Sequence, residues 1–571
     1  MFATSIKQAI SAKRLLPLVL AAASALATAG AHAAAPGITG PSFNLTAKPA
    51  YITQPDGQSI YSWGYGCNGS PGGYAPAGIS GAFCNDMQVP GPTLIVHEGD
   101  SVSVTLTNEL PTAAGNTSIL FPGFNVQAAG GVAGLLTQEA PPCPTATTCT
   151  AANRVTYTFT ATTPGTRAYY SGTQGDLQVE MGLYGVIIVL PSNVPAVCGT
   201  VGFSTPTDGL PVANPGGNKT AHTTWGEGDF RLAAAAYDHP DTCYDREYLF
   251  QFSEMDPNVH IQALVQVTAA GNCTAGAAGC NLNVPTEPYH PAYFLINGRS
   301  MPDDMDTNYA FQYPHQPYNG NPHMHPGELT LLRIVGQGRW QHPFHEHANH
   351  VRILARDGNL ILSSGTVTYD GTSSPSPALA GPLFFTTTTT PGQAMDGIFY
   401  YTGRGLNWDM YGHHDGSSDA NGNLPCTPDK NGYNTIAPTA INYFEWCQDH
   451  DKPMEKLPFG DVGAGGPMTL PDPNLFTNGA WYGGSPYLGP DATTRATFGT
   501  CTGTNNTTSC STTGTTPPSG TIANSPSGEA GYAFMWHSHN EREITTNNIF
   551  PGGMFMMMLI DSREFVIDES N

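Results

Sequence analysis

The chain has few cations and lacks several common catalytic motifs, and each scarcity excludes a class of protein. Only 21 of its 571 residues are Lys or Arg, against 44 Asp and Glu, which gives a formal net charge of -23 at pH 7. No basic stripe that could neutralise a phosphate backbone is visible, so a nucleic-acid partner is not expected. No GxSxG, HExxH or glycine-rich phosphate-binding motif occurs, so hydrolase and nucleotide chemistry have no support.

Long apolar runs are also scarce, and the one near the N-terminus favours export. A cationic start precedes a Leu- and Ala-rich run over Leu15–Ala27, and Ala31-His32-Ala33 follows as an A-x-A cleavage site. This pattern predicts a signal peptide over residues 1–33, because the run is shorter than a bilayer span. No later run reaches that length, so we expect an exported protein, periplasmic or extracellular, without a membrane span.

The twelve cysteines agree with export because they fall into couples along the chain. An even number of cysteines behind a signal peptide is typical of disulfides that clip loops. None forms a CxxC motif, so a cysteine zinc knuckle or a thioredoxin-like redox role is not expected. The predicted couples are Cys67 with Cys84, Cys143 with Cys149, Cys273 with Cys280, Cys426 with Cys447, Cys501 with Cys510 and, more distant, Cys198 with Cys243.

Helical periodicity is scarce, and short β-rich runs between turn residues dominate the chain. Ser101–Asn108 alternates apolar and polar residues, the pattern of a half-buried strand. Further strands are expected at Arg154–Thr160 and Gly182–Leu190, and a second set runs from Glu247–Phe252 to Met554–Ile560. This pattern predicts an all-β protein built from sandwiches or barrels.

Composition divides the mature chain into two strand-rich parts and an insertion. We expect a first domain at residues 34–193, a Pro- and Gly-rich linker at 194–225, and a second domain formed by 226–402 with 527–571. Residues 403–526 are rich in Gly, Asn, Asp, Pro, Ser and Thr and contain two cysteine couples. They are predicted to be a loop-rich, disulfide-containing insertion with little core of its own.

Two histidine clusters stand out. Residues 342–350 read HPFHEHANH and residues 536–541 read WHSHNE. In a strand, residues two apart point to the same face, so the two histidines of each HxH would project together. Four imidazoles suit copper, zinc, iron or nickel, so the sequence predicts a metal site. The predicted ligands are His345, His347, His537 and His539.

Further histidines are weaker candidates for the same site. His323 and His325 form another HxH between two prolines, where an exposed loop pair is the more frequent outcome. His413 and His414 lie in the insertion, and long functional loops do carry site residues. The remaining weaker candidates, from the first cluster, are His342 and His350.

The segments together resemble the multicopper oxidases, a family built from cupredoxin domains. VPGPTL at residues 89–94, with Gly99-Asp100, is similar to the start of that family's first domain, and Gly182–Val189 to its end. HPFHEH is similar to the family's HPxHxH motif, and WHSH to its final HCH motif. The resemblance implies copper and tandem cupredoxin-like Greek-key β-sandwiches. The order of the segments favours two domains; a three-domain, laccase-like layout is the alternative and requires the insertion to be a domain.

The chain departs from the family at its other copper ligands. Leu120 and Pro122 stand where the resemblance places one HxH pair of the first domain, and Tyr170 and Gly172 where it places the second. Ser538 replaces the cysteine of the type 1 copper site. Without that thiolate a blue copper centre cannot form, so four-electron reduction of O2 by the family's usual route is not expected.

The resemblance also implies roles for individual residues. His345 is similar to the type 2 ligand, while the other three predicted ligands are similar to type 3 ligands. His342 corresponds to an orphaned ligand of the lost type 1 site, and Glu543 falls near the second histidine of that site. The four imidazoles suit one copper ion, or two with help from Tyr170, Glu180 or solvent.

The leading hypothesis is an exported copper-binding protein that oxidises a small-molecule or metal-ion reductant at a copper site without type 1 copper, with O2 as the candidate acceptor. The alternative is a non-catalytic copper-binding or structural extracellular protein that retains the scaffold. Two-domain members of the family often form trimers, so the resemblance implies a homotrimer. The acidity of the chain suits solubility.

Overall fold

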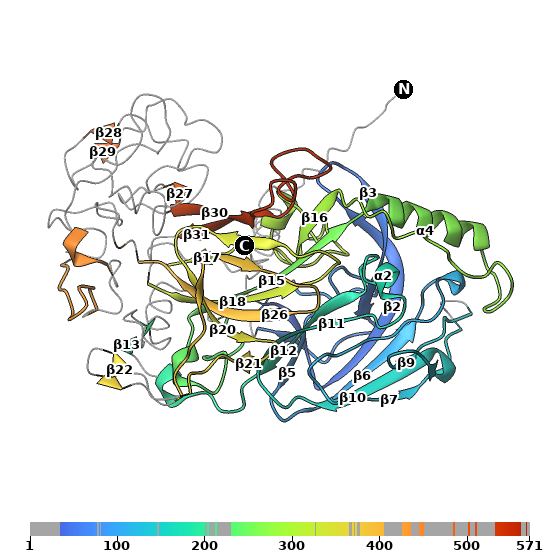
Figure 1. The fold of residues 1–571 in the computed structure, drawn as a ribbon, viewed down its shortest axis with the longest axis horizontal. Coiled ribbons are helices and arrows are strands. Elements are labelled where there is room, and N and C mark those ends of the chain that lie inside the picture. The colour runs from blue at the N-terminus through green and yellow to red at the C-terminus, as the bar shows by residue number, and fades with distance from the viewer. Residues whose placement is uncertain are drawn as a thin grey trace, which may run out of the picture.

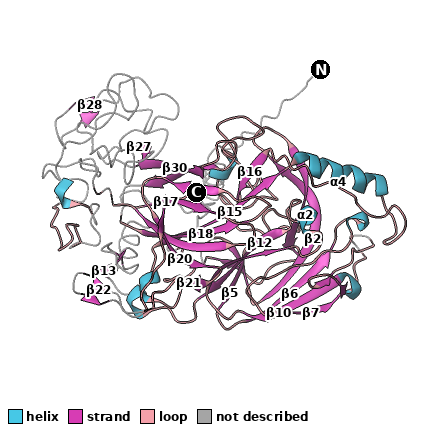
Figure 2. Cartoon of the chain, in the orientation of Figure 1, coloured by secondary structure: helices cyan, strands magenta, loops and turns pink. Residues whose placement is uncertain are grey.

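Strands dominate the structure, a computed structural model, and helices are few (Figure 2). The predicted all-β class is confirmed. The structure describes residues 35–76, 81–144, 148–199, 230–325, 327–364, 377–402, 425–435, 445–449 and 532–560, with a few short pieces between and after them. The predicted signal peptide and most of the predicted insertion lie outside the described residues. The domain boundaries stay a prediction.

The first sandwich consists of two five-stranded sheets that enclose one core. The predicted strands at 101–108 and 154–160 are confirmed as β6 and β10, which pair along their whole length. The first sheet has the order β11 (Gly165–Tyr170), β12 (Tyr184–Leu190), β5 (Leu94–His97), β1 (Gly37–Thr39) and β4 (Tyr74–Ala75). The second has the order β3 (Ser59–Cys67), β2 (Ser42–Thr53), β6 (Ser101–Asn108), β10 (Arg154–Thr160) and β7 (Gln127–Gly130).

The second sandwich pairs a seven-stranded with a six-stranded sheet, whose strands can be followed in Figure 1. Its core contains Phe250, Phe344 and Trp536. The larger sheet runs β16 (Tyr293–Ile296), β15 (Arg246–Met255), β18 (Leu329–Gly336), β26 (Ala394–Tyr400), β20 (Val351–Arg356) and β21 (Asn359–Leu360), with β24 (Leu383–Phe384) on β20. The smaller runs β17 (His323–Met324), β31 (Phe555–Ile560), β30 (Tyr532–Ser538), β19 (Pro343–Glu346) and β25 (Thr386–Thr388), with β27 (Gly484–Ser485) on β30.

In the described part of the chain, the remaining elements are short, apart from one helix. The short strands are β8 (Val132–Ala133), β9 (Gln138–Glu139), β13 (Phe203–Ser204), β14 (Val212–Ala213), β22 (Thr368–Tyr369), β23 (Thr372–Ser373), β28 (Cys501–Thr502) and β29 (Ser509–Cys510). The short helices are α2 (Gly175–Gln178) and the 3-10 turns Thr112–Ala114, Ala151–Asn153, Ala196–Gly199, Pro240–Thr242, Asp303–Met305 and Cys447–Asp449. Helix α4 (Pro257–Ala270) begins where the Asp256 side chain accepts from the amide of Asn258.

The two sandwiches share buried contacts. Val186 of β12 packs in one hydrophobic cluster with Val335 of β18, and the Tyr184 hydroxyl lies 2.7 Å from Ser253 Oγ of β15. Helix α4 follows the second sandwich's β15 but lies against β3 of the first (Figure 1). Within the described residues, no helix is long and apolar enough to cross a membrane.

Five of the six predicted cysteine couples form disulfides. They are Cys67–Cys84, Cys143–Cys149, Cys198–Cys243, Cys273–Cys280 and Cys426–Cys447. The side chains of the sixth couple, Cys501 and Cys510, lie outside the described residues.

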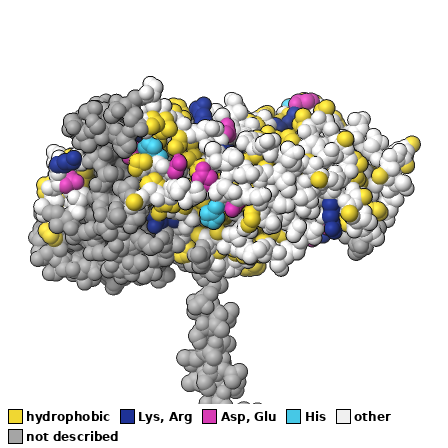
Figure 3. All heavy atoms as spheres, turned by 90° about the horizontal axis from the view of Figure 1, so that it is seen from below, with side chains coloured by type: hydrophobic (Ala, Val, Ile, Leu, Met, Phe, Trp, Pro, Cys, Tyr) yellow, Lys and Arg dark blue, Asp and Glu magenta, His cyan; other side chains and the backbone are white. Residues whose placement is uncertain are grey.

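On the face shown in Figure 3 the described Lys and Arg side chains are scattered rather than gathered into a patch.

Candidate metal centre

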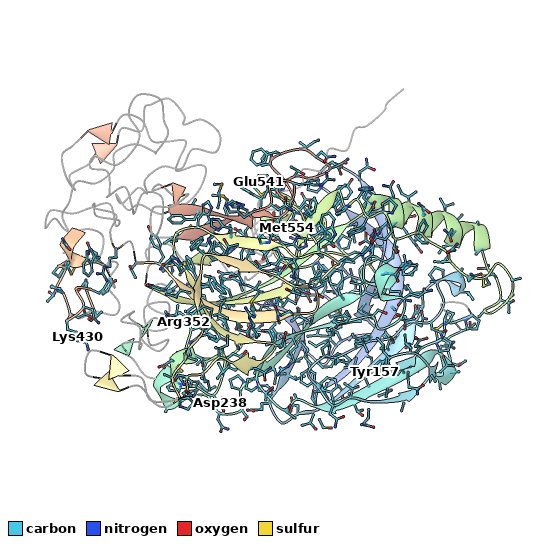
Figure 4. All side chains as sticks on the ribbon, viewed as in Figure 1. Tyr157, Asp238, Arg352, Lys430, Glu541 and Met554 are labelled. Carbon is cyan, nitrogen blue, oxygen red and sulfur yellow. A yellow bond between two sulfur atoms is a disulfide. The ribbon has the colours of Figure 1, made fainter. Side chains whose placement is uncertain are left out.

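The two histidine motifs lie on neighbouring antiparallel strands. In the β19–β30 pair, His345 stands directly opposite His537, and Phe344 opposite Ser538. Because side chains alternate between the faces of a sheet, Phe344 and Trp536 enter the core while both histidines project from the other face. His347 and His539 extend the motifs just beyond the strand ends. Figure 4 labels Glu541 close to this end of β30.

The structure brings the four predicted ligands together. His345 is central, because its ring is edge-on to each of the other three rings. The distances between ring centroids are 4.8 Å for His345–His347, 4.8 Å for His345–His539, 5.1 Å for His347–His537, 5.6 Å for His345–His537 and 5.8 Å for His537–His539. The local period of two in each motif and the pairing of the strands together produce this arrangement.

Two of the four rings are hydrogen-bonded through Nδ1, and the Nε2 atoms of one pair face each other. His537 Nδ1 lies 2.6 Å from the Ser538 carbonyl, which can only accept, so Nδ1 carries the proton and Nε2 has the lone pair. His345 Nδ1 lies 2.7 Å from the hydroxyl of Thr386 on β25. The Nε2 atoms of His347 and His537 are 3.2 Å apart. A tetrahedral ion with bonds of about 2.0 Å holds its ligand nitrogens about 3.3 Å apart, so this pair fits.

The electrostatics of the site favour neutral imidazoles. Burial, together with the neighbouring His537 and His539, lowers the pKa of His345 from 6.5 to about 4. Burial also lowers the pKa of His537. Both rings are therefore neutral near pH 7, which is the form that binds a metal ion.

The four imidazoles do not yet close around one point. Within the described part of the chain, no group of three or more His, Cys, Asp or Glu side chains is arranged to hold an ion as it stands. The donor chemistry and the His347–His537 spacing fit copper, but four-fold coordination requires the side chains to rotate. The ligand set therefore stays a prediction.

Glu346, between two of the predicted ligands, belongs to the opposite face. It is buried, and neither carboxylate oxygen has a hydrogen-bond partner among the described residues. Burial raises its pKa well above the usual range, an effect that the nearby Thr387 hydroxyl offsets only in part. This side chain therefore lies in the core, away from the face that carries the four histidines.

His342 is enclosed by two carboxylates instead of joining the four histidines. Its Nε2 lies 2.9 Å from Glu254 Oε2 of β15, and its Nδ1 lies 2.9 Å from Glu543 Oε2. The Ser538 hydroxyl donates to the same oxygen of Glu543. His342, Ser538 and Glu543 therefore meet, as the resemblance to a type 1 copper site implies. Both ring nitrogens of His342 are already engaged, so it offers no nitrogen to a metal in this arrangement.

The charge of His342 makes stability depend on pH. Burial lowers its pKa, but hydrogen bonds and charges from Glu254 and Glu543 outweigh burial and raise it from 6.5 to about 9. The folded protein thus binds this proton more tightly than the unfolded chain does. The resulting stabilisation is fully present below pH 6.5 and is lost as the pH rises through about 9.

We therefore expect the free energy of unfolding to fall by up to about 3 kcal/mol over this pH range. Urea unfolding of the protein and of His342→Gln across the range measures the effect. The variant should be less stable at pH 6.5 and should lack most of the decline. Parallel pH profiles for the two proteins would contradict this account of the cluster.

The weaker candidates lie outside the four-histidine group. The rings of His345 and His350 both stand edge-on to Phe385, with centroids 5.8 and 5.1 Å away, and burial lowers the pKa of His350. The expectation that His323 and His325 form an exposed loop pair is wrong. His323 begins β17 and is half-buried, while His325 is 2% exposed. Two strands, β31 and β30, separate β17 from β19. His413 and His414 lie outside the described residues.

In the first sandwich, none of the four positions where the resemblance places a copper-binding histidine carries an imidazole. Its two segments do pair, because the amide of Leu120 donates to the carbonyl of Tyr170 at 2.8 Å. A Cβ atom added at Gly172 would lie 2.8 Å from Leu120 Cγ, so leucine fills the space that a side chain there would need. Glu180, a suggested helper ligand, instead accepts from the Tyr289 hydroxyl and the amide of Asp256.

Sequence reasoning missed the residues that surround the site from elsewhere in the chain. Glu254, Thr386 and Phe385 reach it from β15, from β25 and from the residue before β25. None of them lies in a recognisable motif. The contact between His342 and Glu254 spans 88 residues, and only the pairing of β15 within the second sandwich places Glu254 there.

Comparison with known proteins supports the resemblance for the first sandwich. Residues 76–194 match the sequence model of the family described as "Multicopper oxidase". This segment is therefore similar to the multicopper oxidases, as its motifs implied. No curated protein matches the chain.

Several solved structures are similar to the whole chain or to part of it. A blue copper oxidase from Nitrosomonas europaea is 14% identical, with 90% of this chain and 85% of that chain covered and a TM-score of 0.39. A copper nitrite reductase from the same organism is 17% identical, with coverages of 64% and 85% and a TM-score of 0.33. A laccase from Botrytis aclada is 19% identical, with coverages of 64% and 47% and a TM-score of 0.33.

Proposed function

We propose that this chain is an exported copper-binding protein of the multicopper oxidase type, with its copper site on the second sandwich. The observation that carries the proposal is the convergence of four imidazoles from two neighbouring strands, with the Nε2 atoms of His347 and His537 3.2 Å apart. The similarity of the first sandwich to the multicopper oxidases favours copper over other ions that imidazole binds. Five disulfides support export. The ligands would be His345, His347, His537 and His539.

The favoured activity is oxidation of a small-molecule or metal-ion reductant directly at this site, with O2 as the acceptor. Bound copper would supply one-electron redox chemistry. Ser538, His342 and Glu543 are buried and bonded to one another, so a reductant has no open site where the family's type 1 copper would lie. The four-histidine group is more accessible: His539 is exposed, and the neighbouring Phe385 is 49% exposed. Phe385 offers an apolar surface beside the ligands.

The second candidate is a non-catalytic copper-binding protein. The closed cluster around His342 favours it, because no thiolate is present to pass an electron onward from a type 1 copper. Leu120 and Gly172 also favour this candidate, since they occupy first-domain positions where the resemblance places ligands.

By the same resemblance we propose that the protein is a homotrimer. Light scattering measures this oligomeric state.

An anaerobic reduction experiment distinguishes the two functions. Copper-loaded protein is mixed with hydroquinone or with Fe(II), and the Cu(II) EPR signal is followed before and after air is admitted. The enzyme hypothesis predicts loss of the signal, its return in air and repeated turnover, with weaker apparent affinity for hydroquinone in Phe385→Ala. A Cu(II) signal that neither reductant removes would favour the non-catalytic protein.

A further inference from the structure

The cluster around His342 joins the two segments that carry the candidate ligands. His342 lies three residues before His345, directly before β19. Glu543 lies four residues after His539, beyond the end of β30. The 2.9 Å contact between His342 Nδ1 and Glu543 Oε2 therefore ties one histidine motif to the other. Glu254 binds the second nitrogen of the same ring from the opposite sheet.

Glu543 also holds the interior of the second motif. Its Oε2 accepts from the Ser538 hydroxyl, and its Oε1 accepts from Asn540 Nδ2 at 2.9 Å. Ser538 and Asn540 are the residues on either side of His539. One carboxylate thus binds the side chains on both sides of a candidate ligand, as well as the His342 imidazole before the other pair of ligands.

Glu254 anchors this group to the rest of the molecule. Its Oε1 accepts from the backbone amides of Arg339 and Trp340, at 2.7 and 2.9 Å, directly before the first motif. The Tyr289 hydroxyl lies 3.3 Å from the same oxygen and donates to Glu180 of the first sandwich. The cluster is consequently bonded to both ligand segments and, through Tyr289, to the first sandwich.

The burial of this cluster calls for an explanation beyond stability. His342 is 0%, Glu543 1% and Glu254 3% exposed. A buried ion group seldom stabilises a fold more than well-packed apolar residues of similar volume, but its hydrogen bonds fix one geometry. Here the geometry that it fixes is the relative position of the two HxH motifs.

We propose that the Glu254–His342–Glu543 cluster is a metal-independent cross-link that positions the four candidate ligands. By the resemblance, a type 1 copper ion would lie at this place and join the two ligand segments. In this chain, hydrogen bonds of the cluster join them instead. His342 and Glu543 are thus positioning residues, and they do not touch the metal. The expected effect on copper affinity rests on the proposed function, whereas the cross-link between the two segments does not.

The test compares two buried carboxylates. Glu543→Gln removes one charge of the cross-link with little change of shape. Glu247→Gln is the matched control, because Glu247 is equally buried on β15 and pairs with Arg333 at 2.9 Å without touching either motif. We expect the Cu(II) Kd, measured by competition with a chelator, to weaken about 10- to 100-fold in Glu543→Gln and to change little in Glu247→Gln.

Hydrogen exchange of the metal-free proteins supplies a second readout. We expect the amides of β19 and β30 to exchange faster in Glu543→Gln than in Glu247→Gln. Unchanged affinity and exchange in Glu543→Gln, or equal effects in the two variants, would overturn the cross-link. If the parent protein binds no copper, the proposed function fails. In that case the hydrogen exchange of the β19 and β30 amides alone tests whether the cross-link holds the two segments together.

Discussion

Replacing Ser538 by Cys and Glu543 by His together should turn the copper-loaded protein blue. The two positions meet at His342, whose Nδ1 lies 2.9 Å from the Glu543 carboxylate. The double substitution supplies a thiolate and a second imidazole at this point, and trigonal His2Cys coordination is the basis of blue copper sites. Glu254 favours the result, because its bond to Nε2 of His342 directs Nδ1 toward the new ligands.

The visible spectrum measures this gain, with Ser538→Cys alone as the control. The single variant should give a weaker or absent band, because Glu543 still occupies Nδ1 of His342. Copper EPR of the same samples reports separately on the four-histidine site. A double variant that binds copper but stays colourless would show that these three positions do not form a type 1 geometry.

Replacing His345 and His537 by Ala should remove the bound copper. The two rings face each other across the β19–β30 pair, and His345 is edge-on to all three other imidazoles. Their loss leaves two imidazoles, one on each segment, which is too few for the tetrahedral sites that imidazole ligands usually complete. We expect the copper content, measured by atomic emission, to fall to background.

The control for this pair removes two other histidines. His97 on β5 and His290 are both exposed and lie outside the four-histidine group, so His97→Ala/His290→Ala should keep its copper. Circular dichroism should be the same for both double variants, because neither pair lies in the apolar core. Unchanged copper in His345→Ala/His537→Ala would remove the basis of both proposed functions.

Local pattern predicted much of the fold because one face of most strands is buried. The alternation in Ser101–Asn108 reappears as alternating burial over the first six residues of β6, and its last residues are all buried. The fully buried β15 (Arg246–Met255) is longer than the run predicted there, since its residues are covered on both faces and show no alternation. The start of α4 also has a signal in the sequence, because Asp256 precedes Pro257 at the first helical position.

The candidate site was predictable where it depends on neighbours in sequence. Each HxH motif presents two imidazoles on one face because strand geometry has a period of two. The environment of His342 was not predictable in the same way, since Glu254 and Glu543 lie 88 and 201 residues from it. Likewise, the prolines beside His323 and His325 indicated an exposed loop. The segment instead forms β17, which pairs with β31 and is partly buried.

The most direct test of a copper site at the four histidines is the metal content of the purified mature protein, recorded with its copper EPR and visible spectra. The account predicts about one copper per chain, a type 2 EPR signal and no blue band. Protein that stays free of metal after loading with copper would contradict it, and so would an intense blue band from the unaltered chain.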